Sequence, residues 1–210
     1  GNYQALVLSF LLPILVYIAR KGRLYFAGAL FLFSSIFGGL LFSFTRGAWL
    51  GFLSAFLWFC IFKKNRILLL LIPICFVICL LSSDLKTRFI STTDKSSHGE
   101  RECMWSAGLA MFKEYPIFGI GLNNYERYVR KYLPDNLSPS EEDSIANRAC
   151  HSHSNYIQLL SERGILAFLG FLFVLAIFLW QTESLLKTST DEFNSSILLG
   201  GQSAVICFLT

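Results

Sequence analysis

Two arginines of this sequence stand where a guanidinium group could bind phosphate. Arg46 lies between two long apolar runs, and an ionisable residue at membrane depth indicates a functional role by default. Arg101 precedes Trp105 by four residues, so on a helix its side chain could stack on the indole. A guanidinium group matches phosphate oxygens in a bidentate geometry. The alternatives are contact with lipid headgroups for Arg46 and a solvated helical position for Arg101.

A polar run that ends at Gly164 carries a candidate for acid–base chemistry. We expect a helix to begin near Ser152, so that His153 lies in its first turn, where the helix dipole favours a neutral imidazole. A neutral histidine can act as a general base, and the alternative is a hydrogen-bonded interfacial histidine. Three more polar residues share one helical face that must meet protein or water rather than lipid; these are Asn155, Gln158 and Glu162.

A zinc site is the metal alternative for this run, with His151 and His153 as ligands and His98 or Cys150 as the third. Residues two apart diverge on a helix, and the sequence has no H-E-x-x-H or C-x-x-C motif to support this site. The sequence also has no P-loop and no G-x-S-x-G motif, and a single G-x-G at 119–121 is too short to indicate nucleotide binding. We therefore predict neither a metal nor a cofactor.

The elements that must position these residues are strongly apolar. Of the 210 residues, 54% are hydrophobic and 15% are charged, whereas a soluble domain has about 25% charged residues. This composition excludes a soluble globular domain, a disordered chain and a disulfide-rich miniprotein. Six apolar runs are candidate membrane helices: Gln4–Ala19, Leu24–Phe44, Gly47–Phe62, Ile67–Leu81, Ile165–Trp180 and Ile197–Thr210.

The charged residues indicate how the chain is oriented in the membrane. Residues 82–163 hold 10 of the 18 basic and 11 of the 14 acidic side chains. Basic loops at 20–23 and 63–66 follow the first and third apolar runs, and the positive-inside rule places both in the cytoplasm. Arg46 and the charged block then lie on the periplasmic side. The net charge of +4 thus reflects topology and does not indicate nucleic-acid binding.

We predict an all-α fold, a polytopic transmembrane helix bundle with a largely helical periplasmic loop. Residues 1–81 would form four transmembrane helices, 82–153 the periplasmic loop, and 154–210 a helix entering the membrane plus two further spans, the last one truncated. Cys103 and Cys150 both fall in the loop and are a candidate disulfide if the compartment is oxidising.

Within the loop, the apolar spacing predicts a helix over 98–115, which Pro116 ends. A second helix should follow Asn123, whose side chain would cap it together with Glu126. The acidic stretch 134–143 contains prolines and is predicted to be mobile.

Five motifs, taken in this order, resemble the bacterial O-antigen ligase and polymerase superfamily. They are GNYQA at 1–5 before Leu12-Pro13, TRGAW at 45–49, Arg101 with Met104-Trp105, YPIFGIG at 115–121 and HSNYIQLLSERG at 153–164. The family often has Asn after the histidine, where this chain has Ser154. The resemblance covers nearly the whole chain, which we expect to be a central-to-late portion of a longer protein.

The resemblance implies a multi-pass glycosyltransferase of the bacterial inner membrane whose active site faces the periplasm. It implies transfer of a glycan from an undecaprenyl-pyrophosphate carrier to an acceptor hydroxyl, on lipid A core or another glycan. Arg46 and Arg101 would hold the pyrophosphate, and His153 would act at the hydroxyl. A polysaccharide polymerase or a protein O-oligosaccharyltransferase would use the same chemistry. A polysaccharide or lipid transporter is the alternative from another class, but this sequence lacks the internal repeat typical of one.

Overall fold

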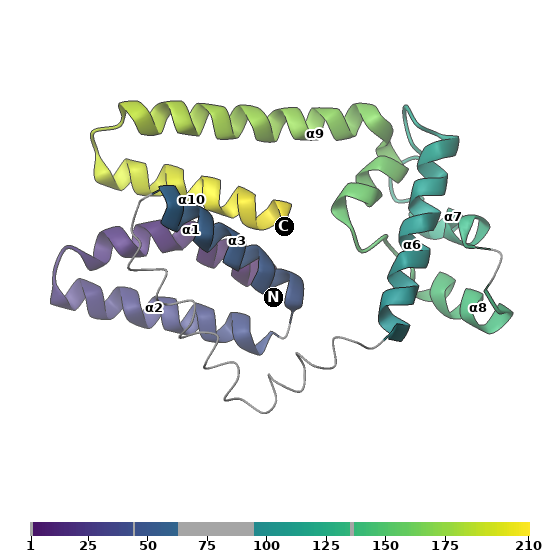
Figure 1. The fold of residues 1–210 in the computed structure, drawn as a ribbon, viewed down its shortest axis with the longest axis horizontal. Helices are drawn as coiled ribbons and strands as arrows, with labels where there is room; N and C mark the ends of the chain where they lie inside the picture. The colour runs from purple at the N-terminus through teal and green to yellow at the C-terminus, as the bar shows by residue number, and fades with distance from the viewer. Residues whose placement is uncertain (1, 44, 63–94, 135–136) are drawn as a thin grey trace. The chain divides into compact units, whose positions relative to one another are not determined.

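The structure is a computed structural model, and it describes residues 2–43, 45–62, 95–134 and 137–210. Every regular element in this part of the chain is an α-helix, which confirms the predicted all-α class (Figure 1). The chain divides into two compact units, Gly1–Ser91 with Ile177–Thr210, and Thr92–Ala176. The predicted span Ile67–Leu81 lies outside the described residues. The assignment of 1–81, 82–153 and 154–210 to membrane and loop stays a prediction.

The first unit is organised around one central helix. That helix is α1 (Asn2–Ala19), which packs against α2 (Arg23–Phe42), α3 (Arg46–Phe62) and α10 (Glu192–Leu209). Glycines let two pairs of these helices approach closely. A Cβ atom on Gly200 would lie 2.3 Å from the carbonyl oxygen of Phe10, and one on Gly51 would lie 2.8 Å from that of Cys207. Close backbone approach at small residues is typical of helices packed within a membrane.

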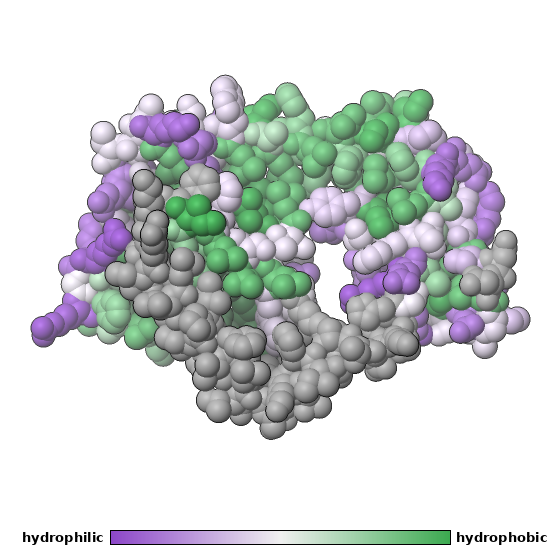
Figure 2. Space-filling model, viewed as in Figure 1, coloured by the Kyte–Doolittle hydropathy of each residue, from purple (hydrophilic) through white to green (hydrophobic). Residues whose placement is uncertain are grey.

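Three of the described helices are long and apolar enough to cross a membrane, namely α1, α2 and α9 (Asn155–Thr188), and α3 is a shorter apolar helix. Large apolar side chains on them are exposed, among them Leu24, Phe31 and Phe173. Figure 2 shows apolar side chains along much of α9. Lipid covers such a surface in a membrane protein, so the helices agree with the predicted membrane bundle.

The second unit packs three helices before α9, and these are α6 (Lys95–Glu114), α7 (Tyr125–Tyr132) and α8 (Pro139–Arg148). Their buried side chains form one core: Met104, Ala107, Met111, Tyr125, Val129, Leu133, Ile145 and Ala149. Three surface ion pairs link the same helices: Arg130–Asp143 at 2.8 Å, Lys131–Glu114 at 3.4 Å and Arg148–Glu100 at 2.7 Å. The core, rather than these exposed pairs, accounts for most of the stability of the unit.

Two predictions for this unit are wrong. The stretch predicted to be mobile contains the first half of α8, which begins behind a capping box formed by Ser138 and Glu141. Asn123 does not cap α7, because its φ of 58° lies in the left-handed region and Asn124 takes the N-cap position, where its side chain makes no capping hydrogen bond.

Candidate functional site

His153 lies in the connection between α8 and α9, two residues before α9 begins. The prediction that it lies in the first helical turn is wrong, because Ser154 precedes the helix and accepts the N–H of Ile157 on its Oγ at 3.5 Å. His153 has a φ of 55°, which few non-glycine residues adopt. Such a conformation costs about 1–3 kcal/mol, and these conformations cluster at functional sites.

Neighbouring polar groups hold the backbone around His153. The N–H of buried Ser152 donates to Oε1 of Gln158 at 2.7 Å, and the Ser152 hydroxyl donates to the carbonyl of Ser154 at 2.8 Å. The carbonyl of Ser154 also accepts the N–H of Gln158 at 2.9 Å. Because the residues on both sides of His153 are bonded in this way, the connection can maintain its strained backbone.

The electrostatic surroundings of His153 favour a neutral ring. The ring centroids of His151 and His153 lie 4.2 Å apart. The pKa of His153 is lowered from its usual 6.5, mainly because the ring is partly desolvated. The electrostatic effects of His151 and Arg101 lower this pKa further. The imidazole is therefore neutral at pH 7 and able to accept a proton. The guanidinium of Arg101 is thus within electrostatic range of the ring.

Arg101 is exposed on α6. Within the described part of the chain it makes no ion pair, hydrogen bond or ring contact, so the expected stacking on Trp105 is not formed. Its neighbour Glu100 pairs with Arg148 instead, at 2.7 Å. An unpaired guanidinium beside a neutral histidine can bind an anion without first breaking an ion pair.

The predicted polar face of α9 is split between different roles. Asn155 is exposed, whereas Gln158 holds the connection that carries His153. Glu162 is buried, and its Oε1 accepts the backbone N–H of Tyr125 at 3.1 Å. Glu162 thus supplies a carboxylate at the N-terminus of α7, a role predicted from the sequence for Glu126. Two of these three side chains therefore position the site rather than line it.

Two glycine-containing motifs pack against each other, in an arrangement we call the glycine clasp (residues 116–121 with 161–165). Three backbone hydrogen bonds join them: Ile120 N–H to Ser161 carbonyl at 2.9 Å, Gly121 N–H to Glu162 carbonyl at 3.0 Å, and Ile165 N–H to Pro116 carbonyl at 2.8 Å. A Cβ atom on Gly164, whose φ is 71°, would lie 2.2 Å from the carbonyl oxygen of Ile117. Sequence reasoning missed this pairing, although the glycines in both motifs were its signal.

The two cysteines considered as a disulfide are both free thiols. Cys103 packs against the core of the second unit, while Cys150 is exposed with its Sγ 3.0 Å from Nδ1 of His151. The candidate disulfide is not formed in this structure, in which the two thiols have different surroundings. Within the residues that the structure describes, no group of three His, Cys, Asp or Glu side chains could hold a metal ion.

Arg46 is the first residue of α3, in the first unit. The turn before it is fixed by Trp49, whose indole N–H donates to the carbonyl of Leu40 at 3.0 Å and whose backbone N–H donates to that of Thr45 at 3.2 Å. This motif therefore sets where α3 begins. That Arg46 converges with Arg101 and His153 stays a prediction, because those residues belong to the other unit.

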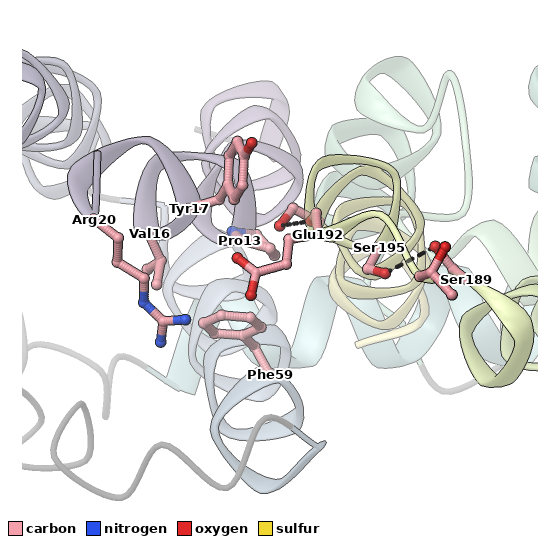
Figure 3. A pocket seen from close by; sticks show the side chains of 10 residues that line it. Pro13, Val16, Tyr17, Arg20, Phe59, Ser189, Glu192 and Ser195 are labelled. Atoms are coloured by element: carbon pink, nitrogen blue, oxygen red, sulfur yellow. Dashed lines mark hydrogen bonds between the residues drawn. The ribbon is translucent and has the colours of Figure 1, made fainter.

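A cavity of about 130 Å³ lies elsewhere in the first unit, and Figure 3 shows Arg20 and Glu192 among the side chains around it. Pro13, Tyr17 and Phe59 contribute further to its lining. None of the predicted site residues lines this cavity. Arg20 belongs to a loop predicted to be cytoplasmic, so we do not assign the cavity to the candidate site.

The fold and the candidate site describe a helical membrane protein. The chain matches the family described as O-antigen ligase over residues 29–172, a range that includes Arg46, Arg101 and His153. It belongs to the O-antigen ligase family. This membership indicates a glycosyl-transfer enzyme of the membrane that acts on a lipid-linked glycan and an acceptor. No curated protein and no solved structure matches the chain.

Proposed function

We propose that this chain carries the periplasmic active site of an inner-membrane glycosyltransferase. The reaction moves a glycan from an undecaprenyl-pyrophosphate carrier to an acceptor hydroxyl, on lipid A core or a similar acceptor. The observation that carries the proposal is the pair formed by His153 and Arg101. Within one compact unit, a neutral and exposed imidazole lies in electrostatic range of an exposed guanidinium with no partner among the described residues.

His153 acts as the general base in this proposal. Its ring accepts the proton of the acceptor hydroxyl while the hydroxyl oxygen forms a bond to the anomeric carbon of the donor glycan. The bond from that carbon to the phosphate oxygen breaks, and the electron pair leaves with the pyrophosphate. The protonated ring then returns its proton to solvent. A positioned general base contributes typically 10²–10⁴-fold to the rate.

Arg101 and Arg46 stabilise the leaving pyrophosphate in this proposal. Negative charge grows on the phosphate oxygens as the bond to the sugar breaks, and guanidinium groups form strong charge-assisted hydrogen bonds to such oxygens. Glu162 and Gln158 contribute indirectly, because they hold α7 and the connection before α9 in place.

The position of His153 along the chain suits a substrate held at a lipid surface. Residues 154–163 separate it from the break in α9 at Gly164, after which α9 is apolar, and 155–163 of these are helical. Nine helical residues span about 14 Å, so the ring lies within roughly that distance of the apolar part of α9. A pyrophosphate attached to a membrane lipid occupies the same headgroup zone.

The test is glycan transfer by the purified full-length protein in detergent, with a glycan on undecaprenyl pyrophosphate as donor. We expect His153→Ala to lower the rate by about 10²–10⁴-fold and added imidazole to restore part of it. His151→Ala serves as the matched control and should keep most of the activity. Full transfer by His153→Ala would contradict the proposal. Glycan transfer in detergent, where no second compartment exists, would contradict the alternative hypothesis that the protein is a transporter.

The role of Arg101 is tested by comparing two exposed arginines of the second unit. Arg101→Ala should lower kcat/KM by about 10–100-fold, since a hydrogen bond to a charged group contributes about 1.5–3 kcal/mol. Arg127→Ala, on α7, should leave it nearly unchanged. Equal effects of both substitutions would show that Arg101 acts only as a general surface charge.

A further comparison of acceptors distinguishes a ligase from a polymerase. A ligase should use lipid A core as the acceptor, whereas a polymerase should use a second lipid-linked glycan.

A further inference from the structure

The connection between α6 and α7 exposes large apolar side chains that the proposed chemistry does not use. Ile117 is 52% exposed, Phe118 is 76% exposed and Leu122 is 56% exposed. We call residues 115–122 the apolar loop. Tyr115, at its start, is also exposed, and an amphipathic tyrosine ring is typical of the membrane–water interface.

The glycine clasp fixes the apolar loop to one level of α9. The N–H of Ile165 donates to the carbonyl of Pro116 at 2.8 Å, and a Cβ atom on Gly164 would lie 2.7 Å from the backbone nitrogen of Phe118. Gly164 is also where the apolar part of α9 begins, and Leu166 and Leu169 just beyond it are more than half exposed. The apolar side chains of the loop therefore start where those of the membrane helix start.

Part of the backbone of the apolar loop is hydrogen-bonded internally. The N–H of Gly119 donates to the carbonyl of Tyr115 at 3.0 Å, and the N–H groups of Ile120 and Gly121 donate across the clasp to α9. The carbonyl of Ile120 accepts from Nδ2 of Asn124 at 3.0 Å. Non-helical backbone next to lipid needs such internal partners, because hydrocarbon offers none.

We propose that the apolar loop inserts Ile117, Phe118 and Leu122 into the acyl-chain edge of the bilayer beside α9. The partner is phospholipid hydrocarbon of the leaflet on the side of the second unit. The loop would thereby hold α6 and Arg101 against the membrane surface. The inference rests on α9 crossing the membrane and does not depend on the glycosyl-transfer chemistry.

The experiment uses a photo-crosslinking amino acid in the full-length protein, reconstituted into bilayers of phosphatidylethanolamine and phosphatidylglycerol. Benzoylphenylalanine replaces Phe118 in one variant and Leu122 in another. Phe173, 65% exposed in the apolar part of α9, is the positive control, and Tyr128, 40% exposed on α7, is the negative control. After illumination, mass spectrometry identifies what each position has captured.

We expect phospholipid adducts at 118 or 122 and at 173, and none at 128. Adducts at 173 with none at either loop position would overturn the proposal. Capture of polyprenyl lipid alone, or of another protein segment alone, would also overturn it by assigning the loop a different partner. The same adducts should form in a His153→Ala background, so failure of the proposed reaction would not obscure this result.

Discussion

His153 combines an unfavourable backbone conformation with an exposed and chemically useful ring. Its left-handed φ is maintained by hydrogen bonds of Ser152, Ser154 and Gln158 on either side. A residue chosen for stability alone would be glycine or asparagine at this position. The strain is therefore consistent with a residue retained for its side chain.

Substituting His153 by glycine should separate stability from activity. Because glycine adopts a φ of 55° without steric cost, His153→Gly should leave the free energy of unfolding unchanged or raise it by up to about 1 kcal/mol. The same substitution should abolish glycan transfer, because it removes the imidazole. Thermal unfolding in detergent and a transfer assay measure the two effects. His151→Gly, at a residue without a positive φ, should give no stabilisation. A large loss of stability in His153→Gly would instead give the ring a structural role.

The pH dependence of transfer should report the lowered pKa of His153. The base is active when neutral, so kcat/KM should be constant near pH 7 and fall as the pH drops below the depressed pKa, under 6.5. His151→Gln removes a neighbour whose electrostatic effect lowers the pKa of His153, so that pKa should rise and the acid limb should move to higher pH. Bound pyrophosphate raises the pKa too, so the acid limb of kcat should lie above that of kcat/KM. An acid limb unaffected by His151→Gln would contradict this electrostatic account.

At the scale of elements, the glycine clasp sets the relation between α6, α7 and the start of α9. Gly119 has a φ of 68°, and a Cβ atom there would lie 2.3 Å from the carbonyl carbon of Glu162. A side chain at Gly119 or at Gly164 would therefore push the two segments of the clasp apart.

Alanine at Gly119 or Gly164 should destabilise the second unit by more than about 1 kcal/mol, because it adds a backbone clash to an unfavourable φ. The matched control is Gly99→Ala on α6, where a Cβ atom meets nothing within 4 Å. That substitution should be neutral or stabilising by up to about 1 kcal/mol, since alanine favours a helix. Thermal unfolding of the three variants measures the difference, and equal Tm values would show that the clasp is not needed.

The sequence predicted which segments are helices better than it predicted how they are joined. Apolar runs and spacing identified α1, α2, α3, α6 and α10, because burial or lipid exposure determines those residues. The capping of α7 was missed because its partner, Glu162, lies 37 residues away. The acidic composition of α8 suggested mobility, although Ser138 and Glu141 formed a recognisable capping signal. At the site, residue types indicated His153 and Arg101, but no local pattern indicated the strained φ of His153. The glycines of the clasp signalled tight turns without showing that the two motifs pair.

For the whole molecule, the central expectation is that the second unit faces the periplasm. Cys150 is an exposed thiol of that unit and can serve as a native probe. A membrane-impermeant maleimide should label it in cells with a permeabilised outer membrane, and Cys150→Ser should abolish that labelling. A cysteine introduced at Lys21, in the loop predicted to be cytoplasmic, should react only after the inner membrane is opened. The reverse pattern would contradict the positive-inside assignment.

The bond between Glu162 and Tyr125 also has a consequence for biosynthesis. The first N–H of α7 obtains its partner only when a residue 37 positions later has been made. At about 5–20 residues per second, the ribosome needs roughly 2–7 s to add that segment. α6, α7 and α8 are thus synthesised before the carboxylate and glycines of α9. The second unit can thus complete its fold only when α9 itself is being delivered to the membrane, which couples maturation of the site to insertion of that helix.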